Sequence, residues 1–415
     1  MVFRAASLTM FFAVALAAAE SGDGATPLLE ASHRDDLAAA TQLIRNGAVV
    51  DAANDLGATP LWAACQNGSS AMVRLLLAAG ANPNLALLQG ETPLMMAARA
   101  GNSGLVELLL IKGAKPNARG PRGQTALMWA AAQKHSDVTG VLVAHGADIQ
   151  LRTESWKQMM AVPPHGHPDY NREIPHGNDT ALLFAARSGD LVSAKILVAA
   201  GAKVNDADAW GVTATVLAAH SGYRDLVEFL LDKGADPTLA EAGFTALHNA
   251  IMHRDELMVA ALLAHGANPN TPLRTWTPTR RSSRDFHYPP VLIGATPYWL
   301  AARFTQPGIM RLLVKHGADP KFVHRSSYLI DTFEPRTEST TAVLAALGKG
   351  GGIAWVQPPA EGREAAALAT VQLAVELGSD VNAANTGGRT ALAAAKALRY
   401  ETVVKFLLEH GALPN

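Results

Sequence analysis

A histidine-rich segment from Val162 to Tyr170 has residue types and spacing that could support chemistry. It places two imidazoles and one carboxylate within five residues. Both groups are ligands for transition metals, but this spacing matches no established zinc signature. The alternative interpretation is a surface loop ordered by its prolines, so we expect no metal or other cofactor. The weak metal-ligand candidates, which include one histidine further along, are His165, His167, Asp169 and His176.

A second segment, near residues 271–290, combines arginine with aromatic residues, and only Asp285 opposes its positive charge. This composition is typical of the anchors in protein interfaces. Such a segment could bind an acidic partner or an anionic surface, and the alternative is a solvated loop. Its candidate partner-binding residues are Arg274, Trp276, Arg280, Arg281, Arg284 and Tyr288.

Histidine also recurs directly before a Gly-Ala pair, at His145, His265, His316 and His410. A histidine in the last turn of a helix faces the negative end of the helix dipole, which predicts a structural role. The sequence contains no glycine-rich phosphate loop, nucleophile elbow, zinc-hydrolase helix or haem motif. We therefore expect a protein that is not an enzyme.

Composition favours stacked helices. Of the 415 residues, 49% are hydrophobic but only 6% are aromatic, so small aliphatic side chains dominate. The 35 basic and 36 acidic residues give a formal net charge of −1. This balance lacks the basic footprint that binding to a phosphate backbone requires, so nucleic acid is not an expected partner.

The N-terminus has the features of a signal peptide. Arg4 precedes an apolar run from Ala5 to Ala19, which ends in small residues before Glu20. The run is shorter than the roughly 20 residues that span a bilayer, so we predict cleavage after about Ala19 and no stable membrane insertion afterwards. Residues 1–19 are the predicted signal peptide and 20–24 a linker. Because Cys65 is the single cysteine, no intramolecular disulfide can form. A periplasmic or secreted protein is expected.

The rest of the chain is repetitive. Ala-Thr-Pro-Leu begins at Ala25 and at Ala58, and Glu-Thr-Pro-Leu begins at Glu91, which gives a period of 33 residues. A threonine can cap the orphan amides of a helix, and a proline at the first helical position loses no hydrogen bond. Apolar residues follow at spacings of three and four, and glycines end each of two short helices. The period therefore predicts stacked helix pairs.

This pattern resembles the ankyrin repeat. The resemblance implies an all-α repeat fold, a solenoid of about ten helix-turn-helix repeats with short β-turn fingers, covering residues 25–415. The repeats start near 25, 58, 91, 124, 179, 212, 244, 295, 340 and 389. Only His248 occupies the histidine position of the motif, so packing is expected to replace its hydrogen bonds in the other repeats.

Four insertions interrupt the repeats, near 156–178, 271–290, 321–338 and 348–364. The first three lie between a closing Gly-Ala and the next threonine, so we expect them to project from one edge. The fourth separates the two helices of the ninth repeat and lies at the opposite end of the helix pair. Clustered insertions commonly extend a binding face, and the alternative is tolerated loop growth.

The resemblance implies a non-catalytic protein-interaction scaffold, monomeric, with an unidentified protein as its partner. Binding would use finger tips, the groove beside the first helices and the edge insertions. Two alternatives remain open: a metal or small-ligand site at the histidine-rich insertion, and a secreted effector or toxin-associated protein. The remaining partner-binding candidates, from the first helices and the fingers, are Met96, Trp129, Phe184, Leu87 and Trp210. Core packing is the alternative for the first-helix residues.

Overall fold

The computed structural model describes residues 24–161, 171–277, 287–329, 334–351, 355 and 359–414. Within them the chain forms two compact units. Unit 1 runs to Glu154 and also includes Asp179–Lys203. Unit 2 comprises Ser155–Asn178 and the chain from Val204 onward. Each unit is a stack of helix pairs.

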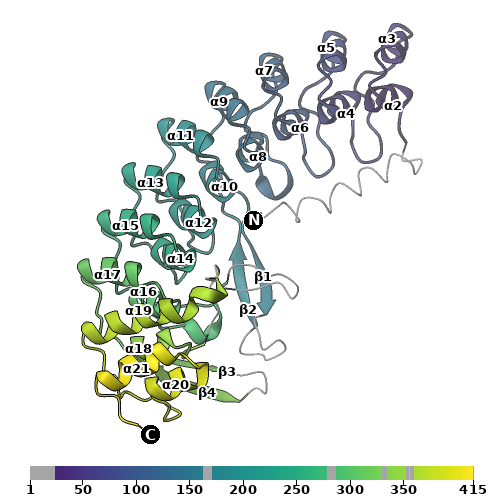
Figure 1. Cartoon of the computed structure of the whole chain (residues 1–415). Coiled ribbons are helices and arrows are strands. Elements are labelled where there is room, and N and C mark those ends of the chain that lie inside the picture. Colours follow the sequence, from purple (N-terminus) through teal and green to yellow (C-terminus); the bar gives the residue numbers. More distant parts are fainter. Residues whose placement is uncertain are drawn as a thin grey trace. The chain divides into compact units, whose positions relative to one another are not determined.

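Unit 1 contains the first five repeats. In each repeat a first helix is followed by an antiparallel second helix, and successive first helices pack side by side (Figure 1). The helices are α2 (Pro27–His33), α3 (Leu37–Arg45), α4 (Pro60–Asn67), α5 (Ser70–Ala78), α6 (Pro93–Ala100), α7 (Ser103–Ile111), α8 (Ala126–Gln133), α9 (Ser136–Ala144), α10 (Ala181–Ser188) and α11 (Leu191–Ala199). A short 3-10 turn, η1 (Pro121–Gly123), precedes α8.

Unit 2 contains the last five repeats, built in the same way. The helices are α12 (Ala214–His220), α13 (Arg224–Asp232), α14 (Ala246–Met252), α15 (Glu256–Ala264), α16 (Pro297–Arg303), α17 (Pro307–Lys315), α18 (Ala342–Ala346), α19 (Arg363–Glu376), α20 (Ala391–Leu398) and α21 (Glu401–Glu409). Two 3-10 turns are also present: η3 (Pro290–Leu292) begins at the end of the second insertion, and η4 (Ala360–Gly362) lies within the fourth.

Each first helix begins where the repeated threonine predicts. In all ten, the threonine side chain accepts a hydrogen bond from the backbone N–H three residues later, as Thr59 does from Trp62 at 3.2 Å. The other nine caps are Thr26, Thr92, Thr125, Thr180, Thr213, Thr245, Thr296, Thr341 and Thr390. Because the cap satisfies an amide that the helix itself cannot, the threonine fixes where the helix starts.

The all-α repeat fold is confirmed, but two of the insertions contain β-hairpins that the sequence did not reveal. Strand β1 (Trp156–Ala161) pairs antiparallel with β2 (Asn171–His176), and β3 (His324–Leu329) pairs with β4 (Pro335–Thr340). Both hairpins lie on the same side of the helix stack of unit 2 (Figure 1). Their strands contain few β-branched residues, and β2 includes a proline, so the strand signal is weak.

Side-chain hydrogen bonds connect several of the fingers with the next repeat. Asn84 donates from its amide to the Gly113 carbonyl at 2.9 Å, and its side-chain oxygen accepts from the Lys115 N–H at 2.8 Å. Asn270 makes the same pair of bonds to Gly317 and Asp319, although an insertion lies between them in sequence. The second insertion therefore lies outside the stack and does not interrupt this pairing.

The core of both units consists mainly of alanine, leucine and other aliphatic side chains, and unit 2 also buries aromatic rings such as Trp299 and Tyr298. The Cys65 thiol is fully buried in α4, and burial raises its pKa. Across the described residues, none of the helices combines the length and the apolar character needed to cross a bilayer.

Candidate partner-binding surfaces

The first-helix face of unit 1 carries three of the candidate binding residues. Met96 on α6, Trp129 on α8 and Phe184 on α10 each lie four residues after a capping threonine. Met96 and Trp129 are 5% and 8% exposed, and Phe184 is half-buried. Packing therefore accounts for most of the surface of Met96 and Trp129, whereas Phe184 also presents part of its ring to solvent.

Two arginines that sequence reasoning missed extend this face. The Arg99 guanidinium lies 5.2 Å from the centre of the Trp129 ring, and the Arg187 guanidinium lies 5.7 Å from that of Phe184. Cations at such distances are attracted to the negative face of an aromatic ring. Arg187 is exposed and also pairs with Asp179 at 2.9 Å. The sequence could have indicated these two arginines, because both lie seven residues after a capping threonine.

The charge on this face is partly desolvated. Burial lowers the pKa of Arg99, and the negative charge of Glu91 partly offsets that shift. Burial also raises the pKa of Glu91, which Arg99 partly offsets. Each group is thus stabilised in its charged form by the other, in an environment poorer in water than the open surface.

In unit 2 the second insertion buries both of its candidate aromatic residues, Trp276 and Tyr288, in the folded chain. Trp276 is 2% exposed and Tyr288 is fully buried. The Tyr288 hydroxyl donates to the Asn249 side-chain oxygen at 2.7 Å, so the ring packs onto α14. The Arg172 guanidinium of β2 lies 5.4 Å from the Trp276 ring. Burying a large aromatic ring stabilises the folded chain more than leaving the ring exposed to solvent.

Of the arginines predicted in this insertion, Arg274 is exposed. Arg280, Arg281 and Arg284 lie outside the described residues. Their role in binding stays a prediction.

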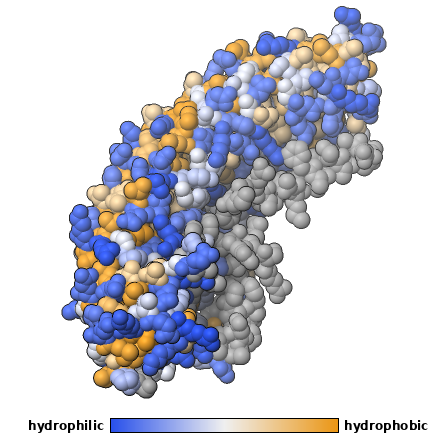
Figure 2. Space-filling view, viewed as in Figure 1, coloured by the Kyte–Doolittle hydropathy of each residue, from blue (hydrophilic) through white to orange (hydrophobic). Residues whose placement is uncertain are grey.

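The fingers expose some apolar surface. Leu87 is half-buried, whereas the adjacent Leu88 is 78% exposed and its backbone N–H donates to the Leu56 carbonyl of the preceding finger. Trp210 is half-buried and meets the Phe244 ring edge-on at 5.9 Å. Figure 2 shows hydrophobic residues in short patches separated by hydrophilic ones over the helices of each unit.

The metal hypothesis falls mostly on residues outside the described part of the chain, namely His165, His167 and Asp169. His176 ends strand β2, where its ring stacks on Trp156 at 5.5 Å. Across the residues that the structure describes, no group of three or more His, Cys, Asp or Glu side chains could hold a metal ion. Metal binding stays a prediction.

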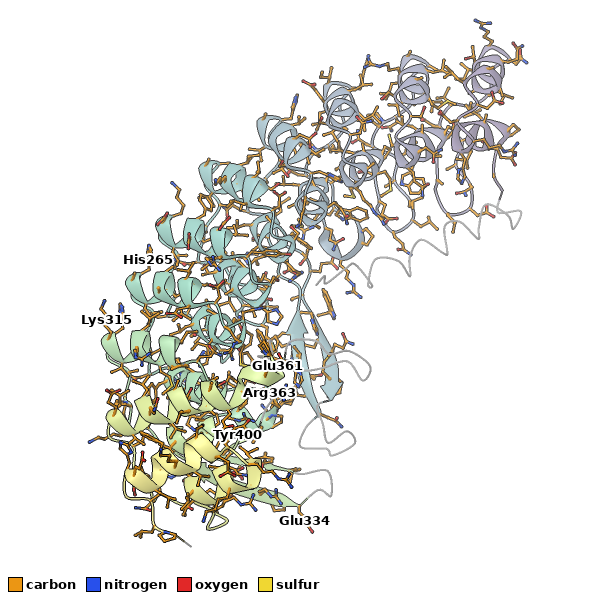
Figure 3. The ribbon with its side chains drawn as sticks, in the orientation of Figure 1. His265, Lys315, Glu334, Glu361, Arg363 and Tyr400 are labelled. Atoms are coloured by element: carbon orange, nitrogen blue, oxygen red, sulfur yellow. The ribbon has the colours of Figure 1, made fainter. Side chains whose placement is uncertain are left out.

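The histidines before Gly-Ala cap the second helices. The Nδ1 atoms of His265 and His410 lie 2.9 Å and 2.8 Å from the carbonyl oxygens of Ala261 and Phe406. Figure 3 shows His265 at the end of α15, away from Glu334 on the hairpin side. This placement matches the structural role expected at the negative end of a helix dipole.

Two different side chains make hydrogen bonds at the histidine position of the motif. His248 completes a capping box with Thr245, and burial lowers its pKa to about 4. In the eighth repeat Trp299 takes this position, and its indole N–H donates to the Thr340 carbonyl at 3.2 Å. Packing alone does not replace the histidine there, because the indole restores a hydrogen bond to the next repeat.

Comparison with known protein families agrees with this geometry. The model of ankyrin repeats in three copies matches residues 5–86, 79–153, 159–241 and 182–273, which together span more than half of the chain. The chain belongs to the ankyrin-repeat family. The ankyrin-repeat domain is a protein-protein interaction domain, and the family is generally non-catalytic.

The curated relatives match only in part. An ankyrin repeat-containing protein of Treponema pallidum (strain Nichols) is 38% identical over 90 residues, which cover 21% of this chain and 30% of that protein. An ankyrin repeat protein of Rickettsia bellii (strain RML369-C) is 31% identical over 133 residues, covering 26% of this chain and 38% of that protein. Protein lin-12 of Caenorhabditis elegans is 35% identical over 124 residues but only 9% of that protein is covered. The likeness concerns the repeats.

Proposed function

We propose that this ankyrin-repeat chain binds a partner protein through the first-helix face of unit 1. The observation that carries the proposal is the row formed by Arg99, Trp129, Phe184 and Arg187, in which two guanidinium groups lie against two aromatic rings. Aromatic and arginine side chains dominate the binding energy of protein interfaces. The exposed part of this row is centred on Phe184 and Arg187.

The partner is expected to contribute carboxylates beside an apolar side chain. The Arg187 guanidinium already accommodates one carboxylate, that of Asp179 at 2.9 Å. A guanidinium presents several N–H donors in a planar fork, so it can bind a further acidic group. The half-buried Phe184 ring supplies apolar contact next to it.

Site-specific photocrosslinking tests this surface. A photoreactive amino acid replaces Phe184, and in a control chain it replaces Val192, which is 55% exposed on α11 of the same repeat. We expect one protein to crosslink from position 184, to be displaced by excess unlabelled chain, and not to crosslink from position 192. Equal crosslinking from both positions, or none from 184, contradicts the proposal.

The affinity of the captured protein provides the second measurement. Phe184→Ala is expected to weaken its binding at least about tenfold, as an aromatic anchor does, whereas Val192→Ala leaves the affinity unchanged. Equal losses in the two variants would show that binding does not depend on the first-helix face.

We also propose that residues 1–19 direct export to the periplasm or beyond. The support is the single positive charge at Arg4, the apolar run that follows and the small residues before Glu20. Expression of the full chain in a Gram-negative host, followed by intact-mass measurement of the fractionated protein, tests this. Cleavage near Ala19 with recovery outside the cytoplasm is expected. A full-length chain in the cytoplasm would refute it.

A further inference from the structure

The fourth insertion contributes one aromatic residue, Trp355, to the first-helix face of the sixth and seventh repeats. The centre of its ring lies 5.0 Å from that of His220, 5.3 Å from that of His253 and 5.1 Å from that of Tyr288. Its indole N–H donates to the His287 carbonyl at 2.9 Å. Two insertions that start at opposite ends of their repeats therefore meet over α12 and α14.

The position that Trp355 contacts has a counterpart in unit 1. His220 is the last residue of α12 and lies seven residues after Thr213. Arg99 and Arg187, the arginines of the proposed partner surface, lie at the same place in their own repeats. His220 and Arg187 therefore occupy equivalent positions on their first helices. Trp355 packs on this position in the sixth repeat, whereas in the fifth repeat Arg187 is exposed to solvent.

The contact has the geometry of a specific aromatic site. Trp355 meets the rings of His220 and His253 at interplanar angles of 67° and 79°, the edge-to-face arrangement that aromatic quadrupoles favour. A hydrogen bond fixes the orientation of the His253 imidazole, whose Nε2 lies 2.7 Å from the His220 carbonyl oxygen. The site combines ring edges with a carbonyl acceptor, which suits an indole or a phenol.

The insertion is anchored four residues before Trp355. The Arg303 side chain donates from Nε to the Gly351 carbonyl at 2.7 Å. Gly351 has a φ of +65°, and a Cβ atom there would lie 2.8 Å from a methyl group of Val291. Glycine therefore allows the chain to lie against η3 at this point, which a larger residue would prevent.

We propose that Trp355 is an intramolecular occupant of the first-helix face of the sixth and seventh repeats, and that a partner segment with an exposed Trp or Tyr side chain binds there by displacing it. This inference rests on the proposed function, because it assigns a second part of the first-helix face to binding and adds regulation to it. Tethering gives Trp355 a high effective concentration, of millimolar order for short linkers, so it excludes weak competitors.

The test needs no partner and uses N-acetyltryptophanamide as the probe. The probe is titrated onto the full chain and onto Trp355→Ala, with N-acetylleucinamide as the apolar control, and the ring signals of His220 and His253 are followed by NMR. Removal of the tethered competitor is expected to strengthen probe binding at least about tenfold. Trp355→Phe keeps an aromatic ring but loses the N–H that donates to His287, so its probe affinity is expected to lie between those of the unaltered chain and Trp355→Ala.

Two results overturn the proposal: equal affinity of the probe for the unaltered chain and Trp355→Ala, or no perturbation of the two histidines in either. Hydrogen exchange of the Trp355 indole N–H in the unaltered chain provides a measurement that does not depend on any variant. Slow exchange is expected because the N–H is bonded to His287, and exchange at the rate of a free indole contradicts the occupancy. Failure of crosslinking at position 184 would refute only the proposed partner surface of unit 1. The probe titration and the hydrogen exchange test the Trp355 site separately.

Discussion

The first-helix faces of the two units differ although their repeats are built alike. In unit 1 the row of Arg99, Trp129, Phe184 and Arg187 ends in the half-buried Phe184 and the exposed Arg187. In unit 2 the corresponding face of the sixth and seventh repeats is covered by Tyr288 and Trp355. The same scaffold thus offers one open surface and one surface that the chain itself occupies.

This difference shows how insertions change an ankyrin stack. They leave the repeats in register, since Asn270 still bonds to Gly317 and Asp319. What they add is a second layer of side chains over the first helices. The buried side chains of the insertions are therefore packed structure, and truncating one of them should affect stability as a change in the core does.

Truncation of Trp276 gives the largest expected effect. This side chain is 2% exposed, so Trp276→Ala should destabilise unit 2 by about 3 to 5 kcal/mol. The exposed neighbour Arg274 supplies the control, because Arg274→Ala should change stability by less than about 0.5 kcal/mol. Urea unfolding measures both. A small effect at Trp276 would show that the insertion is a tolerant loop after all.

Leu→Ala changes in the core allow the packing of the two units to be compared directly. Leu76 on α5 and Leu262 on α15 are fully buried in second helices of regular and interrupted repeats, respectively. Each Leu→Ala change is expected to cost about 2 to 5 kcal/mol, through lost burial and the cavity that remains. Both are measured by urea unfolding. A cost below about 0.5 kcal/mol at either position would contradict the packing of that repeat.

The helix pairs could be predicted from the sequence because their signals are local. Thr59 and Pro60 start a helix, and Gly68 ends it with a φ of +70°, all within ten residues. The repetition of this pattern every 33 residues then implies stacking, since a single pair cannot bury its own apolar surface. The resemblance to the ankyrin repeat places Met96, Trp129 and Phe184 on the first-helix face, because they follow the histidine position of its motif.

The rest could not be predicted because it depends on contacts between distant segments. Nothing local to Tyr288 indicates that its hydroxyl meets Asn249, and nothing near Trp355 indicates His220. The composition of the second insertion predicts an interface equally well whether the rings face a partner or the chain itself. Only Arg274 of its described candidates remains exposed.

Acid is expected to affect unit 2 through its buried histidine. Burial lowers the pKa of His248 to about 4, below its unfolded value near 6.5, so the folded state binds fewer protons. The contribution of neutral His248 to the free energy of unfolding is fully present above pH 6.5 and is lost as the pH falls toward 4. At pH 5 the loss should be about 2 kcal/mol relative to pH 7.5.

Urea unfolding at the two pH values measures this loss. His248→Gln is the matched variant, since glutamine at this position of a capping box can still accept from the backbone N–H of Thr245 but does not titrate. The variant should lose less stability than the unaltered chain between pH 7.5 and pH 5. An equal loss in both chains would assign the acid sensitivity to other groups, such as His253 and His324, whose pKa values burial also lowers.

The finger asparagines give the smallest and most discriminating test of the comparison. Asn84 makes two hydrogen bonds to the next regular repeat, and Asn270 makes the same two across an insertion. At about 0.5 to 1 kcal/mol for each bond, Asn→Ala at either position should cost about 1 to 2 kcal/mol. Equal costs in urea unfolding mean that the insertion leaves the stack intact. A clearly smaller cost at Asn270 would mean that the insertion loosens the stack, and that the second layer over unit 2 compensates for repeats weakened beneath it.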